Sequence, residues 1–444
     1  MPVVKVSAII SRRWTRSSAI RARAVGRDGG WAPIQNSFGE PSYIQFRWNR
    51  MLSVAMMECG YRVRGASAMK VLVSGASMAG LTAAYWFSRH GADVTVVELC
   101  DGLRRGGAPI DIRGEALGTA ARMGILDDAR RQTVPPAEPG TVLDAAGLPV
   151  ATIDLAWFAN ETDDDLEITR DRLNDLLFAA AEPRADFRFG ASIAQLADES
   201  AVEVRFTDGR RESFDLVVGA DGLHSATRRM TFGPESDFLA HQGYYVALAN
   251  LDPDEPWRQA MYSVPGLMAA VRDVGDGPLA YILVRSDEIE YDHRDLDRQR
   301  RIVIDFLGRG DAWELPRLRG AFADDRTTGF YFDSLAQTRM PRWSRGGVAL
   351  IGDAAHCASL LSGMGTSLAM TAAEYLAEEV ARTPGDIPAA CERYERRQRR
   401  HVDKAQASVA EHGPMMVPGT DEELQQRNDL LRRLAAQHAS ASRP

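Results

Sequence analysis

The spacing of apolar and polar positions after Met69 predicts an α/β domain. Residues 71–74 form a short apolar run with β-branched side chains, a glycine turn follows, and residues 81–90 carry apolar side chains at helical spacing. We expect this helix to end at Gly91 and the next strand to occupy residues 92–98. The pattern is that of a βαβ unit whose parallel strands are buried.

The later segments continue to alternate between the helical and the strand period. They predict a helix at 165–181 and strands at 201–206, 213–220, 244–248, 279–284 and 329–332. The region 236–339 is rich in turn residues and is expected to be an inserted sheet domain. Three amphipathic helices are predicted at the C-terminal end, at 367–382, 389–406 and 421–437.

Residues 1–68 differ from the rest because they are rich in arginine, poor in acids and without periodicity. They precede a second methionine, Met69, after which the α/β pattern begins at once. Two explanations stay open: a disordered extension translated from a start codon set too early, or a transit peptide. The apolar core of a secretory signal is missing.

Composition narrows the class of protein. The chain has 444 residues, of which 45% are hydrophobic and 26% charged, and its net charge of −8 gives no reason to expect nucleic acid as a partner. Its four cysteines form no C-x-x-C pair, so neither a disulfide framework nor a metal site is indicated, and a cytoplasmic location fits. No apolar run reaches the roughly 18 to 20 residues of a membrane span.

The first chemical motif is Gly75-Ala76-Ser77-Met78-Ala79-Gly80, between a strand and a helix. Glycines there allow a sharp turn, and amides at the helix start face a pyrophosphate. Glu98 ends the second strand about twenty residues after Gly75, the spacing at which an acid binds a ribose. Ser77 replaces the second glycine of the strict fingerprint, so a structural glycine turn remains an alternative for this motif taken alone.

Two further strands end in glycine and aspartate. Residues 215–220 lead into Asp221-Gly222, and residues 348–351 lead into Gly352-Asp353 and His356. A second glycine-rich helix start, Gly363-Met364-Gly365-Thr366, follows the latter. Ligands of open α/β sheets bind at the carboxyl ends of strands, where such carboxylates can accept from sugar-like hydroxyls. Taken alone, each segment also fits a strand followed by a tight turn.

Together, in this order, the three motifs resemble the group A flavoprotein hydroxylases, the class similar to para-hydroxybenzoate hydroxylase that includes tetracycline and polyketide monooxygenases. The resemblance covers about residues 69–400. It implies an α/β fold: a Rossmann-like FAD-binding domain (69–140, 166–235 and 340–366), an inserted β-sheet substrate domain (141–165 and 236–339) and a C-terminal helical region (367–444).

The resemblance also implies which residues contact FAD. Asp353 would bind the ribityl chain, Arg113 would lie in a loop beside the flavin, Arg170 would start a helix that extends to the cofactor, and Asp221 and Gly222 would serve both FAD and NAD(P)H. The full implied set is Gly75, Ser77, Met78, Ala79, Gly80, Glu98, Arg113, Arg170, Asp221, Gly222, Gly352, Asp353, Gly363, Met364, Gly365 and Thr366. His356 is a weak catalytic candidate, and His224 is expected at the surface.

The implied activity is that of an FAD-dependent monooxygenase of secondary metabolism. NAD(P)H would reduce FAD as a transient co-substrate, and O2 would hydroxylate a small, aromatic or polyketide-like substrate through a flavin C4a-hydroperoxide. The protein would be a monomer or a homodimer. Ala358 and Leu360 stand where the family usually has prolines, which keeps open a non-oxygenase FAD protein. A simple NAD-dependent dehydrogenase would leave the second and third motifs unexplained.

Overall fold

A computed structural model of the chain describes residues 68–106, 108–134, 140–153, 162, 164–198 and 201–441. The chain divides into two units, Met1–Ala66 and Ser67–Pro444, and the described residues belong to the second. The expectation of a disordered or wrongly started extension therefore concerns residues outside the described ones.

The predicted βαβ unit is confirmed as β1 (Lys70–Ser74), α3 (Met78–Arg89) and β2 (Asp93–Glu98). β1 pairs in parallel with β2 and β11 (Leu216–Gly219) in a six-stranded sheet of order β17-β18-β11-β1-β2-β7. The remaining strands of this sheet are β7 (Asp186–Phe189), β17 (Ser344–Arg345) and β18 (Val348–Leu350). Only β17 runs antiparallel to its neighbour.

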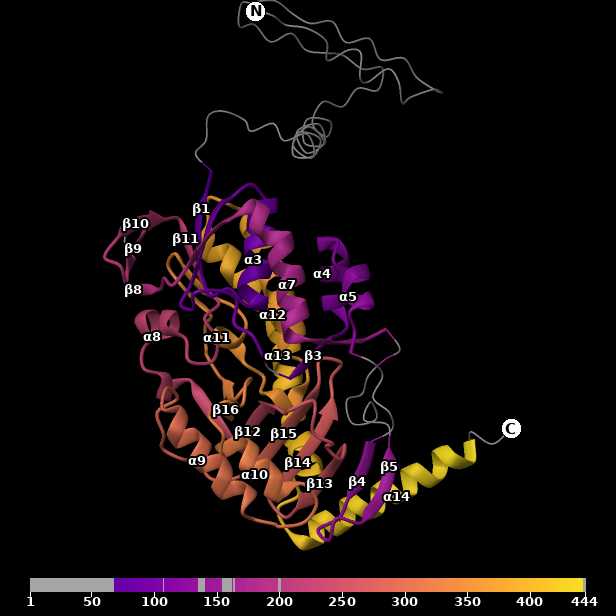
Figure 1. Cartoon of the computed structure of the whole chain (residues 1–444). Coiled ribbons are helices and arrows are strands. Elements are labelled where there is room, and N and C mark those ends of the chain that lie inside the picture. Colours follow the sequence, from indigo (N-terminus) through magenta and orange to yellow (C-terminus); the bar gives the residue numbers. More distant parts are fainter. Residues whose placement is uncertain are drawn as a thin grey trace, which may run out of the picture. The chain divides into compact units, whose positions relative to one another are not determined.

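Both faces of this sheet are covered, because alternate residues of β1 belong to different cores. Val71 and Val73 pack with α3, α7 (Arg170–Ala181) and α12 (Gly365–Arg382). Leu72 packs on a small sheet of order β10-β9-β8 on the opposite face (Figure 1). The strands of the small sheet are β8 (Ile193–Asp198), β9 (Val202–Phe206) and β10 (Arg211–Phe214).

Several of the predicted elements were wrong in their extent, and two of them changed in kind or number. The segment 213–220 is not one strand but the end of β10 and all of β11, which lie in different sheets. The break falls at Asp215, whose carboxylate accepts a hydrogen bond from the Lys70 amide at 2.7 Å. The helix expected at 165–181 begins at Arg170, because residues before it form β6 (Leu166–Thr169), which pairs with β3 (Pro109–Ile112).

A seven-stranded sheet of order β16-β12-β15-β14-β13-β4-β5 forms a second core. Its strands are β4 (Gly140–Leu143), β5 (Pro149–Ile153), β12 (Leu239–Asn250), β13 (Ala260–Val264), β14 (Leu267–Asp273), β15 (Pro278–Arg285) and β16 (Tyr331–Thr338). One face packs on α9 (Leu296–Leu307) and α10 (Leu315–Ala323), which the sequence had not predicted. The opposite face contacts Leu361, Val409 and Leu431.

Long helices complete the fold at the C-terminal end. α13 (Ile387–Met416) continues past its predicted end and packs on α12, while α14 (Asp421–Ala441) packs on β5 and β13 (Figure 1). Shorter helices are α4 (Glu115–Met123), α5 (Leu126–Arg131), α8 (Ala226–Phe232), α11 (Asp353–His356) and the 3-10 turns η1 (Glu182–Arg184), η2 (Glu235–Asp237) and η3 (Leu360–Ser362). Within the described ranges, no helix has the length and apolarity that crossing a bilayer requires.

Candidate functional site

The glycine turn between β1 and α3 is closed so tightly that it admits no side chains at its two ends. Gly75 has a φ of +104°, and a Cβ added there would lie 2.5 Å from the Ala220 carbonyl oxygen at the end of β11. A Cβ at Gly80 would overlap the carbonyl oxygen of Gly75. The first turn of α3 therefore lies directly against the loop that precedes it, and the second motif lies beside the first.

Glu98 is brought to this turn by the pairing of β1 with β2. Its carboxylate accepts a hydrogen bond from the Ala76 amide at 2.8 Å and another from the Cys100 amide at 3.1 Å. The acid at the end of the second strand and the glycine turn thus form one unit, as their spacing in the sequence predicted.

Arg170 places a partly buried cation beside the same turn. It begins α7, whose first turn is capped by Thr169, and its Nη2 donates to Ser77 Oγ at 3.2 Å. Its Nε has no hydrogen-bond partner among the described residues. Burial, together with the charge of Arg104, lowers the pKa of Arg170 to about 10. A cation with an unused donor at a helix start favours an anionic ligand.

Asp353 brings a carboxylate to the vicinity of Arg170. It follows Gly352, whose φ is +58° and whose added Cβ would lie 3.0 Å from the Ala79 side chain, so the third motif packs on the start of α3. Asp353 keeps accessible surface, yet burial raises the pKa of its carboxyl, while the charge of Arg170 lowers it. A side chain with both properties lines a recess inside the protein.

The end of the third motif meets the segment around β3. Arg113 is buried and pairs with Asp111 at 2.8 Å, and its backbone amide donates to Ser367 Oγ in the first turn of α12 at 2.9 Å. A Cβ at Gly363, where φ is +63°, would lie 3.1 Å from Arg113 Nη1. Gly363, which precedes α12, therefore lies beside Arg113, while Gly365 and Thr366 begin α12 after Met364.

The Asp221-Gly222 motif makes its main contacts within the protein. The Asp221 carboxylate accepts from the amide and hydroxyl of Thr227, both at 2.9 Å, and from the Ser225 hydroxyl, so it stabilises the start of α8. Arg228 is fully buried and donates to the carbonyl oxygens of Leu223 and Ala354. These bonds fasten the second motif to the third.

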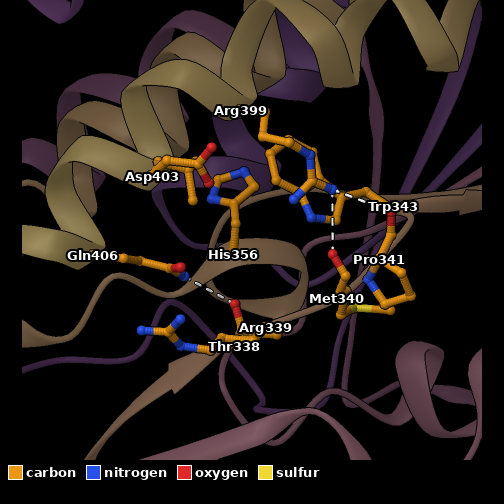
Figure 2. A pocket seen from close by; sticks show the side chains of 10 residues that line it. Thr338, Arg339, Met340, Pro341, Trp343, His356, Arg399, Asp403 and Gln406 are labelled. Atoms are coloured by element: carbon orange, nitrogen blue, oxygen red, sulfur yellow. Dashed lines mark hydrogen bonds between the residues drawn. The ribbon is translucent and has the colours of Figure 1, made fainter.

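His356 ends the short helix α11 that Asp353 begins, and its side chain is held neutral. Burial lowers the pKa of His356 to about 3, its ring packs against Trp343, and its Nε2 lies 3.4 Å from the Tyr394 hydroxyl. It lines a pocket of about 280 Å³, shown in Figure 2, which none of the other predicted site residues line. The pocket residues are Thr338, Arg339, Met340, Pro341, Trp343, His356, Arg399, Val402, Asp403 and Gln406.

His224, expected at the surface, is in fact only 28% exposed and lies between two acids. Its Nδ1 is 2.9 Å from Glu235 and its Nε2 is 3.4 Å from Asp333 on β16. Burial alone would lower its pKa, but the hydrogen bond to Glu235 and the nearby carboxylate of Asp333 raise the pKa of His224 to about 9. The expectation was wrong because Asp333, which contacts the ring, comes from a distant strand. The one signal in the sequence was that Asp333 is an acidic residue within a segment that has the pattern of a strand.

In the part of the chain that the structure describes, no group of three histidine, cysteine or acidic residues could hold a metal ion. The converging groups are instead two glycine-rich helix starts, a partly unsatisfied arginine and a recessed carboxylate. Helix starts and arginine suit phosphate, and the carboxylates suit hydroxyl groups. Fold and site together are those of an α/β protein that binds a nucleotide.

Comparison with known proteins agrees with this class. A family described as "FAD binding domain" matches residues 68–262 and 321–407. An uncharacterised protein of Mycobacterium tuberculosis is 36% identical over 80% of this chain and 96% of its own length. A flavin-dependent monooxygenase of an unknown prokaryotic organism is 34% identical over 73% of this chain and 84% of its own.

Among solved structures, the tetracycline destructase Tet(51) is similar with a TM-score of 0.71 and 30% identity, covering 85% of this chain and all of the other. The chain belongs to the FAD-binding-domain family of flavin-dependent monooxygenases, the group A hydroxylases. It is an FAD-dependent oxidoreductase.

Proposed function

We propose that this chain uses NAD(P)H and O2 to hydroxylate a small aromatic or polyketide-like molecule. The observation that supports this most directly is the recess in which Asp353 and Arg170 meet the glycine turn of α3. The residues present fit FAD, because Arg170 Nε is an unused buried donor beside the glycine turn at the start of α3.

Each part of the cofactor has residues suited to it. The amides after Gly75 and the Arg170 guanidinium would hold the diphosphate, Glu98 the adenosine ribose and Asp353 the ribityl hydroxyls. Arg113 and the segment Gly363–Thr366 would lie along the flavin ring. When bound, FAD supplies the hydride acceptor and the centre that activates oxygen. The protein binds and orients the reactants and excludes water from them.

The face of the seven-stranded sheet that contacts Leu361 supplies the proposed substrate surface. Met261, Met268 and Tyr281 lie on this face. Tyr245 and Tyr262 point to the opposite face and pack with α9 and α10. An apolar, aromatic surface of this kind suits a ring system, which is in keeping with the similarity to a tetracycline destructase.

The nicotinamide cofactor is proposed to bind transiently. The sequence has no second glycine fingerprint besides those that converge on the proposed FAD site. The Asp221 carboxylate is engaged in hydrogen bonds at the start of α8. We therefore propose that the Asp221-Gly222 motif has a structural role in the binding sites of both cofactors.

The three described cysteines are free thiols, which supports the proposed cytoplasmic location. The oligomeric state is proposed to be a monomer or a homodimer, which light scattering of the purified protein distinguishes.

The function is tested with the purified FAD-loaded protein. NADPH and NADH oxidation is followed in air with and without tetracycline or simple phenols, and incorporation of labelled oxygen from 18O2 into the product is measured by mass spectrometry. Substrate-stimulated oxidation with one labelled oxygen per product is expected. A flavin that neither NADPH nor NADH reduces would contradict the proposal and point to a non-oxygenase role; a colourless protein that takes NAD would point to a dehydrogenase.

A further inference from the structure

The pocket of Figure 2 is a second hollow, which the residues of the proposed flavin site do not line. It lies between residues 338–343, at the end of β16, and the side of α13 that carries Arg399, Val402, Asp403 and Gln406. Its volume of about 280 Å³ is room for roughly nine water molecules at about 30 Å³ each. A ligand with about as many non-hydrogen atoms would fill it.

The buried part of the pocket lining is uncharged. His356 and Trp343 are each 1% exposed, and their ring centroids lie 4.6 Å apart. Burial lowers the pKa of His356 to about 3, so its ring is neutral at physiological pH. Met340 and Val402 add apolar side chains to the lining. Any charge that a ligand carries must therefore be matched by the more exposed residues of the pocket.

Arg339 supplies the pocket with a positive charge. Its side chain is exposed, and its Nε and Nη2 donate to Gln337 Oε1 at 3.1 and 2.6 Å. Gln337 is itself fully buried and donates to the carbonyl oxygens of Ala358 and Gln406. Among the described residues, no acid forms an ion pair with Arg339. The guanidinium is thus fixed in position by a neutral group, and its Nη1 stays available to a ligand.

Asp403 supplies a negative charge. It follows Arg399 by one turn of α13, a spacing at which the two side chains could pair. Arg399 instead pairs with Glu395, and its Cζ lies 4.4 Å from the centroid of the Trp343 ring. Its Nη2 also donates to the carbonyl oxygen of Met340 at 3.2 Å. The exposed carboxylate of Asp403 is therefore left without a cationic partner in the part of the chain that the structure describes.

Gln406 adds an acceptor between these two charges. In the view of Figure 2 its side chain lies between those of Asp403 and Arg339. Its Nε2 donates to the carbonyl oxygens of Thr338 and Cys357, both at 3.0 Å, which uses both hydrogens of the amide. Its Oε1 has no donor among the described residues. The pocket thus holds a cation, a carboxylate and an amide oxygen in place before any ligand arrives, which lowers the entropic cost of binding.

We infer that this pocket binds a small zwitterion, a free amino acid with an apolar side chain, whose carboxylate pairs with Arg339 and whose ammonium group pairs with Asp403 and Gln406 Oε1. A simple anion would leave the Asp403 carboxylate unpaired beside it, and a simple cation would leave Arg339 unpaired. The apolar side chain would pack on Met340 and Val402. The inference goes beyond the proposed function and does not depend on it.

A first measurement tests the ligand class by isothermal titration calorimetry of the full, FAD-loaded chain. The probes are L-leucine, 3-methylbutylamine, which is leucine without its carboxylate, and 4-methylpentanoate, which is leucine without its ammonium group. L-Leucine is expected to bind roughly tenfold or more tightly than either of the other two, because it makes both charge-assisted contacts. No measurable binding of L-leucine, or equal affinity for the three compounds, would overturn the inference.

A second measurement assigns each charge of the ligand to its residue. Arg339→Gln should lose the preference for L-leucine over 3-methylbutylamine and keep the preference over 4-methylpentanoate. Asp403→Asn should do the reverse. A variant that had only lost the shape of the pocket would weaken all three ligands alike, and that result would contradict the assignment. Because Asp403 is exposed and makes no ion pair among the described residues, Asp403→Asn is expected to keep the thermal midpoint of the wild type.

The matched control is Arg342→Gln. Arg342 is an exposed arginine of the same segment as Arg339, but it does not line the pocket. Its replacement removes the same charge from the same surface and should leave all three dissociation constants unchanged. An equal loss of leucine binding in Arg342→Gln and Arg339→Gln would overturn the inference, since the effect would then come from the general charge of the surface. No turnover is measured, so none of these results decides the proposed function.

Discussion

At the scale of single residues, Arg170 and Asp353 share one recess, and burial moves both toward their neutral forms. The pKa of the arginine falls to about 10 and that of the carboxyl rises. Each charge therefore gains from a partner that supplies the opposite charge or several hydrogen bonds. A ligand with phosphate at one point and hydroxyl groups at another meets both requirements.

The replacement Asp353→Ala should weaken FAD retention by about 2 kcal/mol, a loss of roughly 10- to 100-fold in affinity, because charge-assisted hydrogen bonds to the cofactor would be lost. The measurement is the flavin-to-protein absorbance ratio after gel filtration, followed by titration of the apoprotein. The control is Asp403→Ala in the pocket of Figure 2, which should retain its flavin. Normal flavin content in Asp353→Ala would refute the assignment.

His224 should make stability depend on alkaline pH. Its pKa of about 9 lies above the ordinary value of 6.5. The contribution of the charged ring to the stability of the fold is therefore complete below pH 6.5 and is lost as the pH rises through 9. The contribution is at most ~3 kcal/mol. Denaturant unfolding between pH 6 and 10 gives the free energy of unfolding of the wild type and of His224→Gln. The difference between the two free energies should shrink with rising pH. A difference that is constant with pH would contradict the charged state.

At the scale of elements, the local sequence pattern was sufficient to predict those helices and strands whose formation depends on their own residues. β1, α3 and β2 follow from an apolar run, the glycine turn and helical spacing, and the glycines were expected to allow the tight turn that the structure shows between Gly75 and Gly80. β6 was missed because its strand state depends on β3, which lies more than fifty residues away along the chain.

The same distinction holds for the site. Glu98 could be singled out because it stands at a fixed spacing from the glycine turn, and Arg170 was named only because of the family resemblance. The surroundings of His224 could not be predicted from the sequence, since Asp333 lies on a separate strand. Similarly, α9 and α10 cover a sheet face that exists only after its strands have paired.

The closeness of α3 to its preceding loop makes Gly80→Ala a severe change. The added Cβ overlaps a backbone carbonyl that cannot move without displacing β1, so about 3 kcal/mol of stability and most of the flavin should be lost. The matched control is Gly320→Ala in α10, where nothing lies within 4 Å of the new Cβ. That variant should be more stable by about 0.5 to 1 kcal/mol. The measurements are thermal unfolding and flavin content of both variants. Equal values for Gly80→Ala and Gly320→Ala would refute the argument.

At the scale of the whole molecule, the six-stranded sheet and the seven-stranded sheet are interleaved along the chain. β4 and β5 follow the first strands of the six-stranded sheet but join the seven-stranded sheet, and β17 and β18 return to the six-stranded sheet after β16. The family match likewise extends to residue 407 and begins at 68, just before β1.

A chain that begins at Met69 should therefore fold and bind FAD as the full chain does. Equal thermal midpoints and equal flavin content are expected, measured by unfolding and absorbance. The control is a chain that begins at Val73, which lacks half of β1 and so loses its pairing with β2 and β11. A Met69 start that fails to bind FAD would show that residues before it take part in the fold.

The interleaving also bears on how the protein is made. On the ribosome, β11 emerges long before β18, and the chain between Gly219 and Val348 must be synthesised before their pairing can form. At ~5–20 residues per second this delay is of the order of ten seconds. During that interval a fully apolar strand edge stays open to other nascent chains, so we expect newly made protein to depend on chaperones at high expression rates, whatever the stability of the finished enzyme.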